Sequence, residues 1–195
     1  MSLGVEAVLV EVTDLLARLD RPYAIAGGVA VAAWGVLRAT RDVDIYLVLD
    51  DPEAQEEVRR GLEGLGYHVP AMREELERMG VCRSRSPGGV FLDLFNATGP
   101  LGDAVLARRR PILLGERRVS CIAPEELAVL KAFSDRPRDY EDLVALISVL
   151  GGLLDLNHVR DWARRLDEGI GTPEVTERLA KAIRESSKPG QAPAC

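Results

Sequence analysis

Residues 24–48, AIAGGVAVAAWGVLRATRDVDIYLV, decide the fold, because they combine a glycine pair with two closely spaced acids. The apolar run before Gly27-Gly28 is short and is followed by a turn signal, which predicts a buried strand that ends at the pair. Residues 29–37 then predict a helix. Residues 43–49 are rich in β-branched and aromatic side chains and are followed by an Asp-Asp-Pro turn, which predicts a second strand. The stretch is therefore predicted to form a strand, a glycine turn, a helix and a strand.

Asp42 and Asp44 open the second of these strands. Side chains two residues apart on a strand point to the same face, so the two carboxylates should lie together. Two like charges a few Å apart repel by about 1 kcal/mol in water and by more inside a protein, so the pair requires a counter-charge. Mg²⁺ is the natural candidate, because one or two carboxylates, with water and substrate phosphates, satisfy it.

A third acid, Asp93, interrupts the apolar run VFLDLF at residues 90–95. A carboxylate in such a strand is costly to bury unless it is paired or bound to a metal. If this strand lies antiparallel beside the strand of Asp42 and Asp44, the three acids converge and can hold two metal ions about 3.5–4 Å apart, as in-line phosphoryl displacement requires. Gly27-Gly28 would let the backbone approach a phosphate at the start of the following helix. Each feature alone is common for structural reasons, and only their order along the chain favours catalysis.

The remaining pattern predicts an α/β half followed by a helical half. Helices are predicted over residues 5–19, 53–65, 137–150, 156–166 and 173–185, and another begins at Pro124. Strands are predicted over residues 67–69, 81–85, 90–95, 112–114 and 117–122, while residues 72–80 are left open. The fold class is α/β (α+β), with a small mixed sheet flanked by helices. The predicted division is an α/β domain over 1–122, a helical region over 123–186 and a disordered, polar tail over 187–195.

Composition excludes several classes of protein. The chain has 195 residues and a net charge of -6, and no stretch approaches the ~18–20 apolar residues of a membrane helix. Acids interrupt the opening segment, which excludes a signal peptide or anchor, so we expect a cytoplasmic protein without a membrane partner. Cys82, Cys121 and Cys195 form no Cys-x-x-Cys pair, which argues for reduced, structural thiols. The negative charge disfavours broad binding to nucleic acid and favours a small or terminal substrate.

The quoted stretch resembles the nucleotidyltransferase superfamily of the polymerase-β type, in which a Gly-Gly or Gly-Ser turn and a helix precede Asp-x-Asp on a strand. It resembles more closely the bacterial group related to AbiEii-type toxins, or minimal nucleotidyltransferases, which has an Arg-x-Thr-x-Asp-x-Asp form. The matching residues here are Arg38, Thr40, Asp42 and Asp44.

The resemblance extends to the helical half. In the AbiEii-like group a hairpin leads into a helix with a lysine and then an Arg/Lys-Asp-x-x-Asp motif. The corresponding residues are Lys131, Arg138, Asp139 and Asp142, so the resemblance covers roughly residues 20 to 150. It implies the nucleotidyltransferase fold, followed by a C-terminal helical bundle.

The resemblance also implies roles for single residues. Gly27 and Gly28 would hold the triphosphate of an NTP, and Lys131 would meet phosphate charge. Asp42, Asp44 and Asp93 would bind two Mg²⁺ ions, and Asp93 would help to deprotonate the attacking hydroxyl. Many relatives have serine second in the glycine motif, whereas Gly28 followed by Val29 offers only backbone donors.

The flanking charges leave alternatives open. Arg38 and Arg41 either bind nucleotide phosphate or pair with the neighbouring acids. Asp139 and Asp142 lie three residues apart on one predicted helix, where a structural role in orienting Arg138 or Lys131 is favoured over a catalytic one.

We expect transfer of a nucleoside monophosphate from an NTP to a hydroxyl acceptor, which is an RNA 3′ end, a protein or a small molecule such as an aminoglycoside. A toxin–antitoxin toxin with an antitoxin partner fits the resemblance. Arginine clusters at residues 83–85, 108–110 and 117–118 form either an RNA-contacting patch or a solvated surface. The alternative function is a non-catalytic nucleotide-binding or toxin–antitoxin interaction protein, against which the presence of all three acids argues.

Overall fold

The computed structural model describes residues 3–187, so the predicted disordered tail lies, apart from Ser187, outside the described residues. The described chain forms two compact units. The first contains residues up to Ala30 and Arg38–Ala123, and the second contains Val31–Leu37 and the residues from Pro124 onward. The predicted domain boundaries stay a prediction.

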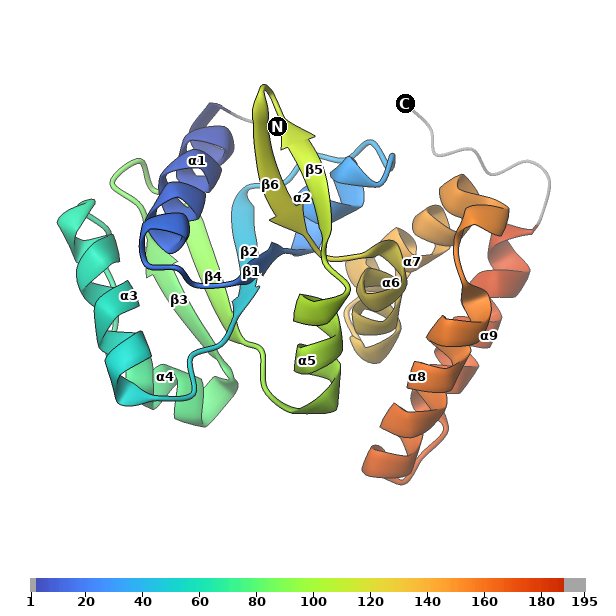
Figure 1. The fold of residues 1–195 in the computed structure, drawn as a ribbon. Helices are drawn as coiled ribbons and strands as arrows, with labels where there is room; N and C mark the ends of the chain where they lie inside the picture. The colour runs from blue at the N-terminus through green and yellow to red at the C-terminus, as the bar shows by residue number, and fades with distance from the viewer. Residues whose placement is uncertain (1–2, 188–195) are drawn as a thin grey trace. The chain divides into compact units, whose positions relative to one another are not determined.

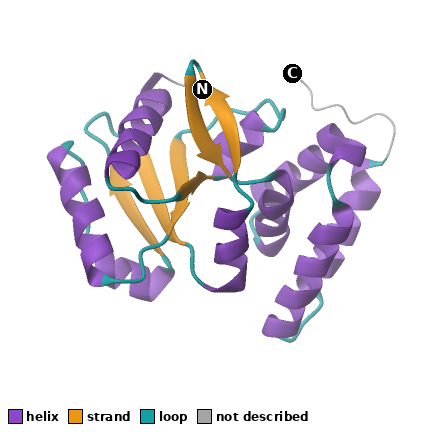
Figure 2. Ribbon diagram, in the orientation of Figure 1, coloured by secondary structure: helices purple, strands orange, loops and turns teal. Residues whose placement is uncertain are grey.

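A six-stranded mixed sheet forms the centre of the first unit, which confirms the predicted fold class. Its strands are β1 (Tyr23–Ile25), β2 (Asp42–Leu47), β3 (Val81–Arg85), β4 (Phe91–Asn96), β5 (Arg110–Leu114) and β6 (Arg117–Cys121). They are arranged in the order β3-β4-β2-β1-β6-β5. Figure 2 shows the β5–β6 hairpin extending away from the other strands. Strand β6 pairs with β1 through Cys121, whose register partner is Ile25.

The direction of β4 corrects one prediction. The strand that carries Asp93 runs parallel to β2, and the predicted antiparallel pairing was wrong. Between β2 and β4 the chain forms the helices α3 (Pro52–Gly64) and α4 (Met72–Met79) and then strand β3. Because the tight turn after β3 pairs this strand antiparallel with β4, β4 returns in the direction of β2. The acids still become neighbours, but in a parallel register.

The hydrophobic core of the first unit lies between the sheet and the helices α1 (Leu3–Arg18), α3 and α4, which gather beside β3 and β4 in Figure 1. Alternate residues of β2 and β4 are fully buried in it, together with apolar residues of the helices. These residues include Val43, Ile45, Leu47, Leu92 and Leu94 of the sheet, and Leu9, Leu16 and Leu62 of the helices. Since side chains alternate along a strand, Asp42 and Asp44 are left on the opposite face of β2.

Several element boundaries differ from the prediction. The helix expected over residues 29–37 is α2 (Gly27–Ala33), which starts at the glycine pair and ends before Gly35, whose φ of 97° lies in the left-handed region. The strand expected over residues 67–69 is a single bridge between His68 and Arg85. Within residues 72–80, where the sequence pattern favours no single element, Met72–Met79 form α4. The helix α5 (Gly99–Ala107) was not predicted.

The second unit is helical, as predicted. It contains α6 (Pro124–Phe133), α7 (Pro137–Leu150), a 3₁₀ turn η1 (Gly151–Leu153), α8 (Leu156–Ile170) and α9 (Glu174–Ser186). Helix α9 packs against the other three helices, and α6 packs against α7 and α8. Its buried side chains include Leu127, Leu143, Leu146, Val159, Trp162 and Leu179. In the part of the chain that the structure describes, no helix combines the length and the apolar character needed to cross a membrane.

Candidate active site

Two cross-strand rows on one face of the sheet collect the predicted acids. Each row takes one residue from β2, β4 and β3: Asp44, Asp93 and Arg83 in the first, and Asp42, Phe91 and Arg85 in the second. Side chains that are directly opposite one another on paired strands project to the same face and interact. The register therefore brings the third acid beside the acid pair, and it places an arginine of the edge strand at the end of each row.

The glycine turn lies directly against Asp44. The amide of Ala26 donates to the carbonyl of Asp44 over 2.8 Å, so the end of β1 is tied to β2 at this residue. Gly27 has a φ of +56°, and a Cβ added to it would lie 1.7 Å from Oδ2 of Asp44. Glycine is therefore required at residue 27 both for its backbone conformation and for the space that the carboxylate occupies.

The second glycine packs against the loop that leads into β2. A Cβ added to Gly28 would lie 2.6 Å from Oγ1 of Thr40 and 3.0 Å from Nη2 of Arg38. The buried hydroxyl of Thr40 donates to Oδ1 of Asp42 over 2.8 Å. Arg41, the other predicted phosphate ligand, is exposed. Thr40 is thus a positioning residue for Asp42. This role was not predicted, although a threonine two residues before an aspartate can form such a contact.

Asp93 is held by a bidentate ion pair. Nε of Arg83 donates to Oδ1 of Asp93 over 2.7 Å, and Nη2 donates to Oδ2 over 2.6 Å. Asp93 is only 5% exposed, whereas the side chain of Arg83 is 57% exposed. The hydrogen bond to Asp93 is the main cause that raises the pKa of the Arg83 guanidinium, and the charges of Asp93, Asp42 and Asp44 raise it further against the effect of burial. Arg83 therefore experiences the field of all three acids.

Aromatic rings line the same face. The guanidinium carbon of Arg83 lies 5.2 Å from the centre of the Phe91 ring, and that of Arg85 lies 5.9 Å from it. The rings of Tyr46 and Phe95, which are paired two residues further along β2 and β4 than Asp44 and Asp93, stack with their centres 4.8 Å apart. Such cation–π and stacking contacts limit the movement of the side chains beside the acids.

The donor set of this face fits a hard cation on the acid pair. Asp42 and Asp44 supply carboxylate oxygens from one face of β2, and Mg²⁺ needs only one or two carboxylates when phosphates and water complete its shell. Among residues 3–187, no group of three or more Asp, Glu, His or Cys side chains is arranged to hold a metal ion. Asp93 instead pairs with Arg83. Binding of metal by all three acids stays a prediction.

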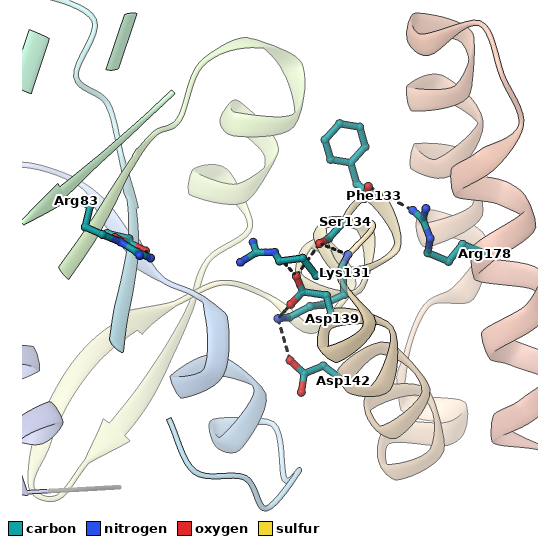
Figure 3. A network of polar contacts seen from close by, with 9 residues as sticks. Arg83, Lys131, Phe133, Ser134, Asp139, Asp142 and Arg178 are labelled. Carbon is teal, nitrogen blue, oxygen red and sulfur yellow. Dashed lines mark hydrogen bonds and ion pairs between the residues drawn. The ribbon is translucent and has the colours of Figure 1, made fainter. Parts of the chain in front are cut away.

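The second unit contains a buried network around Lys131 (Figure 3). Nζ of this lysine, which is 8% exposed, lies 2.9 Å from Oδ2 of Asp142 and also contacts Asp139. Oγ of Ser134 donates to Oδ2 of Asp139 over 2.6 Å. Burial raises the pKa of Asp139, but the hydrogen bonds from Lys131 and Ser134 outweigh it, so the pKa lies below its ordinary value. Both aspartates contact Lys131, as the predicted structural role requires, while that role and phosphate binding by Lys131 stay predictions.

Solved structures share this fold. The solution structure of the antibiotic-resistance factor ANT(2'')-Ia aligns with a TM-score of 0.64 and 18% identity, over 88% of this chain and 95% of its own. The crystal structure of ANT(2'')-Ia with adenylyl-2''-tobramycin aligns with a TM-score of 0.60 and 19% identity, over 83% of this chain and 98% of its own. The lincosamide antibiotic adenylyltransferase LnuA, with lincomycin bound, aligns with a TM-score of 0.53 and 20% identity, over 72% of this chain and 95% of its own. At these identities the similarity establishes the fold.

Sequence comparison identifies the family. No curated protein sequence matches the chain at a significant level. A family model described as a nucleotidyl transferase of unknown function, DUF2204, matches residues 5–181. The match includes the glycine turn, the two cross-strand rows and the Lys131 network. The chain therefore belongs to the DUF2204 family of nucleotidyl transferases.

Proposed function

We propose that this nucleotidyl transferase moves a nucleoside monophosphate from an NTP to a hydroxyl acceptor, and that Asp42 and Asp44 form the centre of its active site. The observation that supports the proposal best is the close approach of Asp44 to Gly27, because a Cβ on this glycine would lie 1.7 Å from the carboxylate. The backbone of the turn and the acid pair are thereby held together. A triphosphate can contact the backbone of the turn, while a cation bound to the acid pair neutralises the charge of the triphosphate.

Each residue of this site has a proposed task. Asp42 and Asp44 would hold Mg²⁺, which supplies positive charge to the triphosphate and lowers the pKa of the acceptor hydroxyl. Gly27 and Gly28 would admit the phosphates close to the backbone, since neither has a side chain in the way. Thr40 keeps Asp42 oriented through its hydrogen bond.

Basic side chains would bind the nucleotide. Arg38, which lies against Gly28, and the exposed Arg41 flank the acid pair and suit phosphate oxygens. Lys131, in the second unit, is retained as a candidate phosphate contact. Its two aspartate partners would keep it charged and in place.

A small molecule is our first choice of acceptor. The net charge of -6 repels long nucleic acid and attracts a cationic acceptor such as an aminoglycoside. ANT(2'')-Ia, which was solved with adenylyl-2''-tobramycin, shares the fold. The second candidate is an RNA 3′ end or a protein hydroxyl in a cytoplasmic toxin–antitoxin system, with an antitoxin as partner. The resemblance of Arg38-x-Thr-x-Asp-x-Asp to AbiEii-type toxins supports it.

Label transfer tests the proposal. The purified protein is incubated with Mg²⁺ and each NTP carrying a labelled α-phosphate, together with an aminoglycoside and lincosamide panel, total RNA or cell protein. We expect one acceptor class to become labelled, and we expect the label to be lost in the double variant D42N+D44N. Asp103→Asn, at an exposed aspartate of α5, is the matched control and should keep full activity.

Each contrary outcome has a separate meaning. Transfer that survives in D42N+D44N would refute the assignment of the site but not the activity. Binding of NTP without transfer to any acceptor would favour the non-catalytic alternative over an enzyme.

A further inference from the structure

Asp93 is the acid of the candidate site that Arg83 holds. It lies in the row of Asp44, yet both of its carboxylate oxygens already accept hydrogen bonds from Arg83, over 2.7 and 2.6 Å. It is 5% exposed, so water does not provide an alternative partner for its charge. Its charge therefore depends on the guanidinium.

The position of Arg83 is determined from three sides. It is the direct register partner of Asp93 on β3, and the two hydrogen bonds are parallel, which fixes the plane of the guanidinium. Its guanidinium carbon also lies 5.2 Å from the centre of the Phe91 ring. Moving Arg83 away would leave a carboxylate buried without a counter-charge, which is a costly state for a protein.

A metal ion on Asp93 would have to share that carboxylate with the guanidinium. A divalent cation on either oxygen would lie within a few Å of a positive group, and like charges repel strongly where little water screens them. The hydrogen bonds of Arg83 go to both oxygens of Asp93, whereas Asp42 and Asp44 act on Arg83 through their charges. Asp93 is thus the carboxylate of the row whose two oxygens Arg83 occupies.

We infer that Arg83 takes the place of a second metal ion in this site. Asp93 is then a positioning residue that holds Arg83, and the resident Mg²⁺ is a single ion on Asp42 and Asp44. A guanidinium has five N–H donors, of which Asp93 uses two, and the side chain is 57% exposed. The remaining donors bind a phosphate oxygen of the nucleotide. The inference rests on the proposed function for the identity of the substrate.

Titration with Mn²⁺, followed by the electron paramagnetic resonance of the free ion, tests the number of metal sites. We expect the wild type to bind a single ion and Asp93→Asn to bind it with an affinity within about twofold of the wild type. If Asp93→Asn weakens metal binding by about tenfold or more, as loss of a ligand does, the inference is overturned. A second Mn²⁺ in the wild type that is lost in Asp93→Asn would also overturn it.

The complementary variant is Arg83→Met, which frees Asp93. It should bind a second Mn²⁺ that the wild type does not bind, and failure to gain this ion in a folded variant counts against competition for Asp93. Because Arg83→Met can unfold by leaving Asp93 unpaired, the double variant R83M+D93N, which removes both charges, is measured beside it. The double variant should fold and bind a single ion.

Nitrogen-15 NMR of the Arg83 Nε–H group gives a direct readout that does not require metal binding to the free protein. In the presence of Mg²⁺ and a non-hydrolysable NTP analogue, the signal should stay protected from exchange with water, because the pair with Asp93 persists. Loss of protection when the nucleotide binds would show that the pair opens and would refute the inference.

The double variant D42N+D44N tests the proposed function separately from this inference. Metal binding that survives in D42N+D44N contradicts the acid-pair site, whereas the Asp93 and Arg83 variants report only on the second cation.

Discussion

The carboxylate of Asp44 occupies the space that a side chain on Gly27 would fill. A Cβ at residue 27 would lie 1.7 Å from Oδ2 of Asp44 and 2.5 Å from its Cγ, and the φ of +56° is costly for any residue with a side chain. In Gly27→Ala, Asp44 must therefore move, at a cost of about 1–2 kcal/mol for the backbone conformation alone. We expect kcat/KM for nucleotide transfer to fall about 100-fold, the effect of a misplacement near 1 Å.

Gly64→Ala is the matched control for that variant. Gly64 is the last residue of α3, and a Cβ added to it meets no atom within 4 Å. Activity should be unchanged, and the free energy of unfolding should rise by up to about 1 kcal/mol, since alanine favours a helix. If Gly27→Ala has the same kcat/KM as Gly64→Ala, activity does not depend on the position of Asp44.

Thr40→Val tests whether the orientation of Asp42 matters. Valine keeps the shape of threonine but removes the hydroxyl that donates to Oδ1 of Asp42 over 2.8 Å. Loss of one hydrogen bond should lower the free energy of unfolding by about 0.5–1.5 kcal/mol. Loss of a residue that orients a metal ligand should raise the Mg²⁺ concentration for half-maximal activity about tenfold. Thr40→Ser keeps the donor and should restore the Mg²⁺ response, and equal responses of both variants would exclude the positioning role.

The stretch that decides the fold was predictable because its signals are local. The strands on both sides of Gly27-Gly28 follow from short apolar runs and turn residues, and the same-face placement of Asp42 and Asp44 follows from strand geometry alone. The direction of β4 was not predictable in this way. It depends on how the chain returns after α3 and α4, and the hydrophobic pattern of a strand is the same in either direction.

The partner of Asp93 could have been predicted from the hairpin. The turn signal is centred on Gly88, and a register symmetric about this residue pairs Arg85 with Phe91 and Arg83 with Asp93, as observed. Helix α5 had a weaker signal, since Gly99 and Gly102 lower its helix propensity. Gly102 is required by a tertiary contact, because a Cβ on it would lie 2.4 Å from the carbonyl carbon of Ala97.

Acid sensitivity should reveal the contribution of Asp139. Its pKa in the folded protein is lowered from 3.8, so the stability that it contributes is present above that value and is lost as the pH falls through the lowered pKa. In Asp139→Asn the free energy of unfolding at neutral pH should fall by about 2 kcal/mol, because hydrogen bonds to a charged group are lost. The difference from the wild type should shrink to zero at low pH.

Urea unfolding over a series of pH values measures this difference. Glu141→Gln is the matched control, since Glu141 is exposed on the same helix, α7. It should follow the wild type at every pH. If the wild type and Asp139→Asn lose stability in parallel as the pH falls, the network around Lys131 does not depend on the charge of Asp139.

The two described thiols should be inert in the folded protein. Burial raises the pKa of Cys82 to about 11 and that of Cys121 to about 12, and both residues are 0% exposed. Because the thiolate is the nucleophile, alkylation near pH 8 should proceed only through opening of the fold. The measurement is mass spectrometry after iodoacetamide treatment of Cys195→Ser, which removes the thiol that lies outside the described residues. Reaction of either thiol at the rate of a free cysteine without urea would contradict its structural role.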